Sequence, residues 1–187
     1  ISEEGVMVNH HRKLMPTYSE KILYGQGDAA GLKTVDTNWG KLGGLICWEH
    51  WMPLSRQALH NENELIHVAL WPTVHEMHQV ASRHYAFEGR CFVIAAGQMM
   101  QVKDIPPSLI LPEHFKNDPD KYILNGGSCV IDPKGNYLLE PQFDKEEILY
   151  CTIDNFDTAI KEKLTLDTTG HYSRRDIFDF TVNRKRK

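Results

Sequence analysis

The segment GGLICWEH, residues 43–50, decides the fold class, because a short apolar run gives way there to helical spacing. Residues 42–46 (LGGLI) have the length and apolar character of a buried strand. Pro53 suits the first turn of a helix, and apolar side chains follow it at helical spacing. The segment therefore predicts a strand, a turn at Cys47 and a helix.

The same alternation continues outward along the chain. Strands are predicted to end near residue 13 and to cover 32–35, 65–71, 91–96 and 148–153, helices to cover 76–90 and 158–164, a hairpin 128–139 and a loop 117–120. Strands that alternate with helices are typical of an α/β fold. Since no repeat or linker divides the chain, we expect residues 1–187 to form a single domain.

Composition excludes several classes of protein. Of the 187 residues, 41% are hydrophobic and 25% are charged, as in ordinary globular chains. The net charge of −4 argues against nucleic-acid binding, and we expect the basic end, residues 183–187, to be a solvated tail. No apolar run approaches the ~20 residues that cross a bilayer. The four cysteines form no CxxC pair, which favours reduced thiols in a cytoplasmic protein.

Cys47 stands where the predicted strand stops and the helix starts. A turn of this kind projects its side chain out of the sheet, and the next backbone N–H, that of Trp48, can donate to an oxyanion. A helix N-terminus also lowers the pKa of a thiol. On this local pattern alone, a nucleophile and a buried inert cysteine are equally good interpretations of Cys47.

A second segment, residues 10–20 (HHRKLMPTYSE), has a lysine at the end of a predicted strand. Lys13 can be a plain surface cation, which the spacing alone favours. It can also be a partly desolvated charge that stabilises anionic tetrahedral states beside a thiolate. Glu20 would then hold the lysine by a charge-assisted hydrogen bond.

Both segments resemble the nitrilase superfamily of carbon–nitrogen hydrolases. HRKLMPTYSEK with YGQGD is similar to the segment around the catalytic lysine of that family, and GGLICWEHWMPL is similar to its nucleophile segment. Further similar stretches follow in the family's order: HYAFEGRCFV, NGGS and GHYSR. The resemblance covers nearly the whole chain and strongly favours Cys47 as a nucleophile.

The resemblance implies a four-layer α-β-β-α sandwich, here lacking its N-terminal part. The family uses a Glu-Lys-Cys triad with a second glutamate nearby, and by this likeness Lys13 is the lysine, Cys47 the nucleophile and Glu20 the second glutamate. The triad's first glutamate is expected in the missing part, and neither Glu3 nor Glu4 is assigned to it. Because the chain opens on Ile rather than Met, we expect a piece of a longer protein.

The triplet Cys47-Trp48-Glu49 resembles the nitrilase branch, whereas amidase branches more often have Tyr-Asp after the cysteine. The implied function is hydrolysis of a nitrile to the carboxylic acid and ammonia through a covalent thioimidate and thioester, with no metal or organic cofactor. The alternatives are an amidase of the same superfamily and an inactive fragment that serves as an assembly piece. The expected partners are a small nitrile or amide, the N-terminal remainder and further copies of the chain, with no nucleic acid and no membrane.

Further candidates follow a buried strand, where α/β proteins place ligand contacts. Trp71 and Thr73 fit a pocket lining and plain packing equally well. His75 and His78 are three residues apart on a predicted helix start and could hold a metal. Since no convincing set of further ligands accompanies them, we interpret both as histidines of the helix surface or pocket rim.

Overall fold

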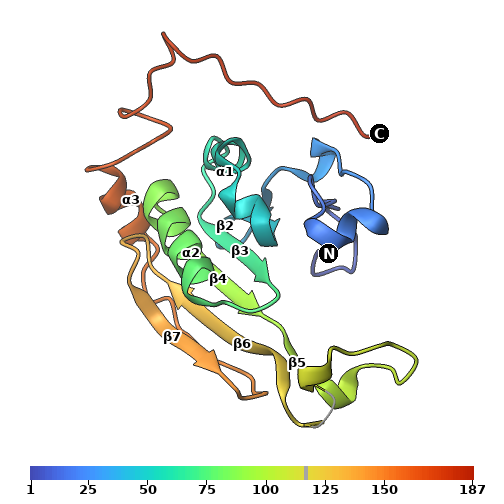
Figure 1. Cartoon of the computed structure of the whole chain (residues 1–187). Coiled ribbons are helices and arrows are strands. Elements are labelled where there is room, and N and C mark those ends of the chain that lie inside the picture. Colours follow the sequence, from blue (N-terminus) through green and yellow to red (C-terminus); the bar gives the residue numbers. More distant parts are fainter. Residues whose placement is uncertain (116–117) are drawn as a thin grey trace.

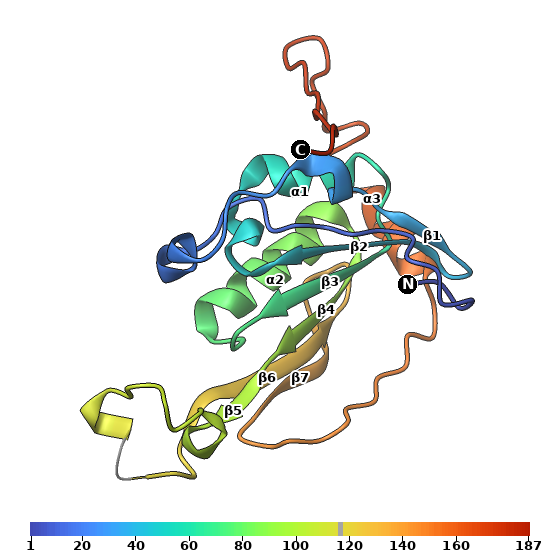
Figure 2. The same ribbon diagram turned by 90° about the vertical axis from the view of Figure 1, so that its right-hand side faces the viewer.

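Three parallel strands, β2 (Gly40–Ile46), β3 (Ile66–Trp71) and β4 (Phe92–Gly97), form the centre of a mixed sheet. The structure is a computed structural model that describes residues 1–115 and 118–187. The crossovers contain α1 (Pro53–His60) and α2 (Glu76–Gly89), which both lie over the same face of the sheet (Figures 1 and 2). This βαβαβ unit confirms the α/β arrangement that the apolar runs predicted.

Antiparallel strands flank the parallel centre. The strand β1 (Val35–Thr37) pairs with β2, and β6 (Tyr122–Ile131) pairs with β4, β5 (Met99–Gln101) and β7 (Tyr137–Phe143). The helix α3 (Asp157–Lys163) follows, close to its predicted range. Short 3₁₀ helices lie at Tyr18–Ile22, Ala29–Gly31, Cys47–Trp51, Val102–Asp104 and Glu113–Phe115.

The two faces of the sheet have different environments. Along β3, the alternate side chains of His67, Ala69 and Trp71 are buried beneath the helices. On the opposite face, Leu70 is 47% exposed and Ile94 is 38% exposed. Parallel strands are normally covered on both faces. The described residues thus supply one helical layer and one sheet layer of the four that the resemblance implies.

Two predicted strands are wrong. Residues 6–13 are extended but pair with a loop instead of a strand, and the Gly27 N–H donates to the Lys13 carbonyl at 2.9 Å. Residues 148–153 also form no strand, because no other described segment offers them a ladder of backbone hydrogen bonds. The loop predicted at 117–120 begins outside the described residues.

The basic C-terminal end, predicted to be a solvated tail, instead forms hydrogen bonds and ion pairs with the rest of the chain. The Arg186 guanidinium donates to Asp28 at 3.1 Å, and the backbone N–H of Lys187 donates to the same carboxylate at 2.8 Å. Arg12 forms a further ion pair with Asp28, whose side chain is only 3% exposed. A buried carboxylate is costly without opposite charge, so the tail lies where Asp28 attracts it.

Leu45 in β2 tests the position of the core. Its side chain is 1% exposed, so Leu45→Ala leaves a cavity and is expected to lower the free energy of unfolding by about 2–5 kcal/mol. Leu164→Ala is the control, because Leu164 is 80% exposed, and its effect is expected within about 0.5 kcal/mol. Denaturant titration measures both. Equal effects of the two substitutions would contradict a core centred on β2.

Candidate active site

Cys47 lies at the carboxyl end of β2, where it is the first residue of a 3₁₀ helix. Its φ of +56° is in the left-handed region, which side chains other than glycine rarely adopt. The residue is half-buried and lines a cavity of about 350 Å³, together with Glu20, Leu70 and Gln98 among others. The strained turn therefore directs the thiol into a cavity at the sheet edge, as the strand–turn–helix pattern predicted.

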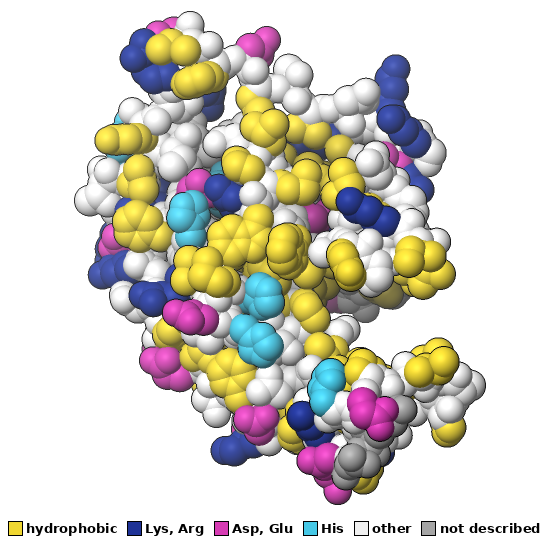
Figure 3. Space-filling view, viewed as in Figure 1, with side chains coloured by type: hydrophobic (Ala, Val, Ile, Leu, Met, Phe, Trp, Pro, Cys, Tyr) yellow, Lys and Arg dark blue, Asp and Glu magenta, His cyan; other side chains and the backbone are white. Residues whose placement is uncertain are grey.

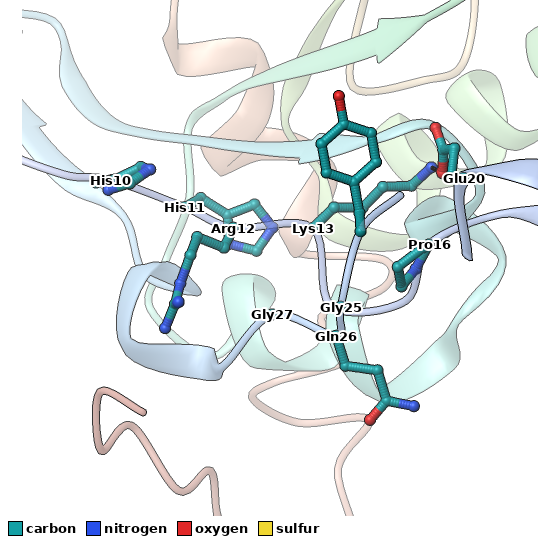
Figure 4. Close-up of a pocket in the computed structure, with 10 residues that line it drawn as sticks. His10, His11, Arg12, Lys13, Pro16, Glu20, Gly25, Gln26 and Gly27 are labelled. Atoms are coloured by element: carbon teal, nitrogen blue, oxygen red, sulfur yellow. Dashed lines mark hydrogen bonds and ion pairs between the residues drawn. The ribbon is translucent and has the colours of Figure 1, made fainter. Parts of the chain in front are cut away.

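Lys13 and Glu20 form a close pair beside this cavity. Lys13 Nζ lies 2.5 Å from Glu20 Oε2 and donates to Thr17 Oγ1 at 3.0 Å. Glu20 also accepts the Thr17 backbone N–H at 2.6 Å, and the bonds from Lys13 and Thr17 lower the pKa of Glu20. Figure 4 shows Lys13 reaching toward Glu20, with Gln26 pointing away from both. Lys13, 14% exposed in its side chain, is thus a fixed cation rather than a free surface lysine.

Opposing influences act on the Cys47 thiol. Burial raises its pKa and is the largest effect, while the charge of Lys13 and a hydrogen bond from the Trp48 backbone lower it. The carboxylates of Glu20 and Glu49 raise it further, and the net shift is upward. The depression expected from a helix N-terminus is therefore outweighed by burial. A thiol in this state needs a base to take its proton before it attacks.

Glu49, two residues after Cys47, joins the two segments of the site. Its buried carboxylate accepts the Ile46 backbone N–H at 2.7 Å and the Leu14 backbone N–H at 2.6 Å, and His11 Nε2 lies 3.0 Å away. Burial raises the pKa of Glu49, but the bonds from His11, Leu14 and Ile46 outweigh it and lower the pKa overall. Glu49 was not among the catalytic or binding residues predicted from the sequence, although an acidic residue in the largely apolar segment GGLICWEHWMPL was a signal for a buried partner.

The aromatic and hydroxyl candidates take different positions. Trp48 has an exposed ring, and its backbone N–H is the group close to the thiol. Trp71 is among the residues that line the Cys47 cavity, but its ring is buried, stacks on His50 at 4.5 Å and donates to Ser82 at 3.1 Å. Thr73 is buried, and its hydroxyl accepts a backbone N–H from β6 at 3.3 Å. Thr73 thus connects the loop after β3 to β6.

The two histidines that could have held a metal have other partners. His75 Nε2 lies 3.3 Å from Asn125 Oδ1, and His78 Nδ1 donates to the Thr73 carbonyl. The His78 ring also stacks on Trp71. Across residues 1–115 and 118–187, no three His, Cys, Asp or Glu side chains are grouped so that they could hold a metal ion.

Sequence comparison assigns the chain that forms this site to a protein family. The family model described as carbon–nitrogen hydrolase matches residues 1–160, so the chain belongs to the carbon–nitrogen hydrolase family. The chain is 37% identical over 183 residues to an aliphatic nitrilase of Sinorhizobium fredii and 39% identical over 185 residues to nitrilase 2 of Arabidopsis thaliana. These matches cover 97% of this chain but 58% and 54% of the relatives, so it spans little more than half of their length.

Structure comparison agrees at the level of the fold. A carbon–nitrogen hydrolase of Helicobacter pylori G27 superposes with a TM-score of 0.69 at 23% identity, covering 90% of this chain and 58% of that one. Nit3 of Saccharomyces cerevisiae, described as a member of branch 10 of the nitrilase superfamily, gives 0.67 at 19% identity, covering 92% and 57%. The fold that the sequence resemblance implied is therefore confirmed.

Glu49→Gln tests the junction between the two segments. Its amide NH₂ must face one of the two backbone N–H groups, so the free energy of unfolding at pH 7 is expected to fall by about 2–3 kcal/mol. The pKa of Glu49 lies below its ordinary 4.5 in the folded chain, so its stabilising effect is complete above that pH and fades as the pH falls through the folded pKa.

The gap between wild type and Glu49→Gln should accordingly narrow in acid, as denaturant titrations at several pH values will show. Glu146→Gln is the matched control, because Glu146 is exposed, and it should change stability by no more than about 0.5 kcal/mol. A Glu49→Gln variant as stable as the Glu146→Gln control at pH 7 would contradict the bridging role.

Proposed function

We propose that this chain carries the nucleophile and the charge-stabilising lysine of a hydrolase that converts a nitrile to a carboxylic acid and ammonia. The observation that carries the proposal is the convergence of two segments: Glu20 holds Lys13 and also lines the cavity that contains Cys47. Relatives named as nitrilases, including an arylacetonitrilase of Trametes versicolor that is 36% identical, support a nitrile as the substrate class.

In the proposed reaction, the Cys47 sulfur forms a bond to the nitrile carbon, and the thiol proton passes through a base to the nitrile nitrogen. The product is a thioimidate, to which water adds. Collapse of the resulting tetrahedral state expels ammonia and leaves a thioester, and a second water releases the acid and the thiol. Lys13 and the Trp48 N–H stabilise the anionic tetrahedral states. The base corresponds to the triad's first glutamate, which we place outside this chain.

An amidase of the same superfamily is the second candidate, because a cysteine thiol can attack an amide carbon in the same way. The triplet Cys47-Trp48-Glu49 and the nitrilase-named relatives favour the nitrile. Ammonia release from butyronitrile and phenylacetonitrile, compared with release from the corresponding amides, separates the two activities. If the isolated chain is inactive and the complete gene product is active, the chain by itself is an assembly piece.

Exposed apolar surfaces support the proposed partners. Leu70 and Ile94 lie on the open face of the parallel strands, where a second sheet from the N-terminal remainder would complete the four layers. Met77, Val80 and Phe87 are exposed along α2, and this stripe favours contact with a second copy of the chain. Figure 3 shows hydrophobic side chains gathered in several groups on the helical side of the molecule.

The cytoplasmic location that the cysteine usage favours stays a prediction. Within the part of the chain that the structure describes, no helix combines the length and the apolar character needed to cross a membrane.

Trp71 and Thr73 likewise stay predicted pocket residues. Trp71 lines the Cys47 cavity, whereas the Thr73 hydroxyl is buried and accepts a backbone N–H from β6, so the support for Trp71 is more direct.

The nucleophile is tested by intact-mass detection of a covalent adduct on the complete gene product. With phenylacetonitrile under rapid quench, we expect a mass increase of one substrate unit in wild type and none in Cys47→Ala. Among the four cysteines, all within the described residues, Cys47 is the one whose thiol the charge of Lys13 influences. Cys151→Ala is the matched control, since Cys151 is an exposed thiol. An adduct that survives Cys47→Ala and disappears in Cys151→Ala would refute the assignment.

Lys13 is tested by Lys13→Met, which keeps the aliphatic length and removes the charge. Loss of one donor to an oxyanion costs about 10²–10³-fold in kcat, and we expect a loss of that order with a smaller change in KM. Steady-state ammonia release measures both constants. Lys33→Met is the control, because Lys33 is exposed and lies in neither of the two segments that form the site. Similar kcat values for the two variants would exclude a catalytic Lys13.

A further inference from the structure

A chain of buried hydrogen bonds leads from the core to the backbone of Cys47. The distances along it are 2.5 Å from Tyr85 Oη to Glu64 Oε2, 2.8 Å from Glu64 Oε1 to His67 Nδ1, 3.0 Å from His67 Nε2 to His50 Nε2 and 2.7 Å from His50 Nδ1 to the Cys47 carbonyl oxygen. The four side chains are at most 2% exposed. None of them belongs to the triad or its second glutamate.

The donor and acceptor of each hydrogen bond can be assigned by starting at the Cys47 carbonyl, where the chain of bonds ends. A carbonyl oxygen only accepts, so His50 Nδ1 carries a proton and donates to Cys47. In a neutral His50 ring, Nε2 is then an acceptor, and His67 must donate to it through its own Nε2. A neutral His67 consequently accepts at Nδ1, and the group that donates there is Glu64 Oε1. Glu64 can donate only as the protonated carboxylic acid.

The surroundings favour this uncharged form. Burial raises the pKa of Glu64 to about 8, although the hydrogen bond from Tyr85 partly opposes the shift. Burial lowers the pKa of His50 to about 3 and that of His67 well below its ordinary value. The whole chain is therefore neutral near pH 7. Hydrogen bonds that run in one direction through a low-dielectric interior strengthen one another.

The charged and titratable groups around the chain leave that assignment intact. The Arg56 guanidinium donates to the His50 backbone carbonyl at 2.9 Å and pairs with Glu88 at 2.7 Å. His60 packs against the Tyr85 ring. Glu49 acts on both His50 and His67 through its charge only, because its carboxylate is occupied on the other side of the turn.

The peptide plane between Cys47 and Trp48 transmits the effect to the site. In a trans peptide the C=O and the following N–H point in opposite directions. Since His50 holds the Cys47 carbonyl on the core side, the Trp48 N–H is turned to the other side, where it acts on the thiol. The left-handed φ of Cys47 is strained and needs such a restraint.

We propose that His50, His67 and Glu64 are positioning residues that fix this peptide plane and thereby aim the Trp48 N–H, with Glu64 present as the carboxylic acid. The consequence for catalysis rests on the proposed function, whereas the effect on the thiol does not. Gly43 in β2 provides the necessary space, because a Cβ there would lie 1.9 Å from Glu64 Oε1. The first glycine of the GGLIC segment therefore leaves the space that the Glu64 carboxyl group occupies.

Three variants of the complete gene product test the proposal. In Glu64→Gln, the amide NH₂ donates to His67 and the amide oxygen accepts from Tyr85, so the chain is preserved. Glu64→Met fills similar space but breaks the chain. His50→Phe keeps a ring against Trp71 but removes the side-chain donor to the Cys47 carbonyl. Lys13, Glu20 and Glu49, which also act on the thiol, are unchanged throughout.

The first readout is the pH dependence of Cys47 alkylation by iodoacetamide, followed by peptide mass spectrometry. We expect Glu64→Gln to match wild type, and Glu64→Met and His50→Phe to raise the thiol pKa, because the misdirected Trp48 N–H no longer stabilises the thiolate. With phenylacetonitrile, kcat should fall about 10–100-fold in the latter two, less than the loss of a whole oxyanion donor, with a small change in KM.

Two results would overturn the proposal: a Glu64→Gln variant as impaired as Glu64→Met, or an alkylation profile that is unchanged in His50→Phe. If a variant fails to fold, difference infrared spectroscopy of wild type against Glu64→Gln decides. A protonated-carboxyl band in wild type supports the chain, and its absence at pH 7 refutes it. If the alkylation profiles of all variants are as expected but wild type hydrolyses no nitrile, the proposed function is contradicted, whereas the positioning role is not.

Discussion

The Glu49 carboxylate is the interaction on which the site depends. It accepts a backbone N–H from Leu14, one residue after Lys13, and another from Ile46, one residue before Cys47. The cation and the thiol therefore come from segments held by the same buried group. Neither segment can move away without leaving a buried negative charge short of donors, which is costly. The spacing between Lys13, Glu20 and Cys47 follows from this constraint.

Two buried glutamates next to the same turn have opposite protonation states. Glu49 faces His11 and two backbone N–H groups, and these donors keep its pKa low despite burial. Glu64 has one hydroxyl donor and an imidazole that needs a proton, so burial prevails and its pKa is high. Glu49 restrains the turn through an ionised acceptor on one side, and Glu64 through a neutral donor chain on the other. The strained backbone of Cys47 lies between them.

The regular elements around the nucleophile could be predicted from the sequence because their signals are local. Apolar runs and helical spacing located β3, β4 and α2, and the turn at Cys47 followed from the change of period. The strand predicted before Lys13 failed because a strand needs a partner, and local spacing does not reveal one. The pairing of Lys13 with Glu20 was one of two interpretations that the residues left open, and the family resemblance favoured it over the surface cation that spacing alone favoured. The His50–His67 contact depends on the register that places His67 of β3 opposite Gly43, which is tertiary information.

Amide hydrogen exchange at Leu14 and Ile46 tests the central constraint most directly. If one carboxylate holds both segments, both amides are protected from exchange in wild type. In Glu49→Gln, both amides should lose protection together as the temperature rises toward the point at which the turn unfolds. Amides of β4, such as that of Ala95, serve as the internal reference for global unfolding. Independent behaviour of the Leu14 and Ile46 amides, or protection unchanged by the substitution, would contradict the account.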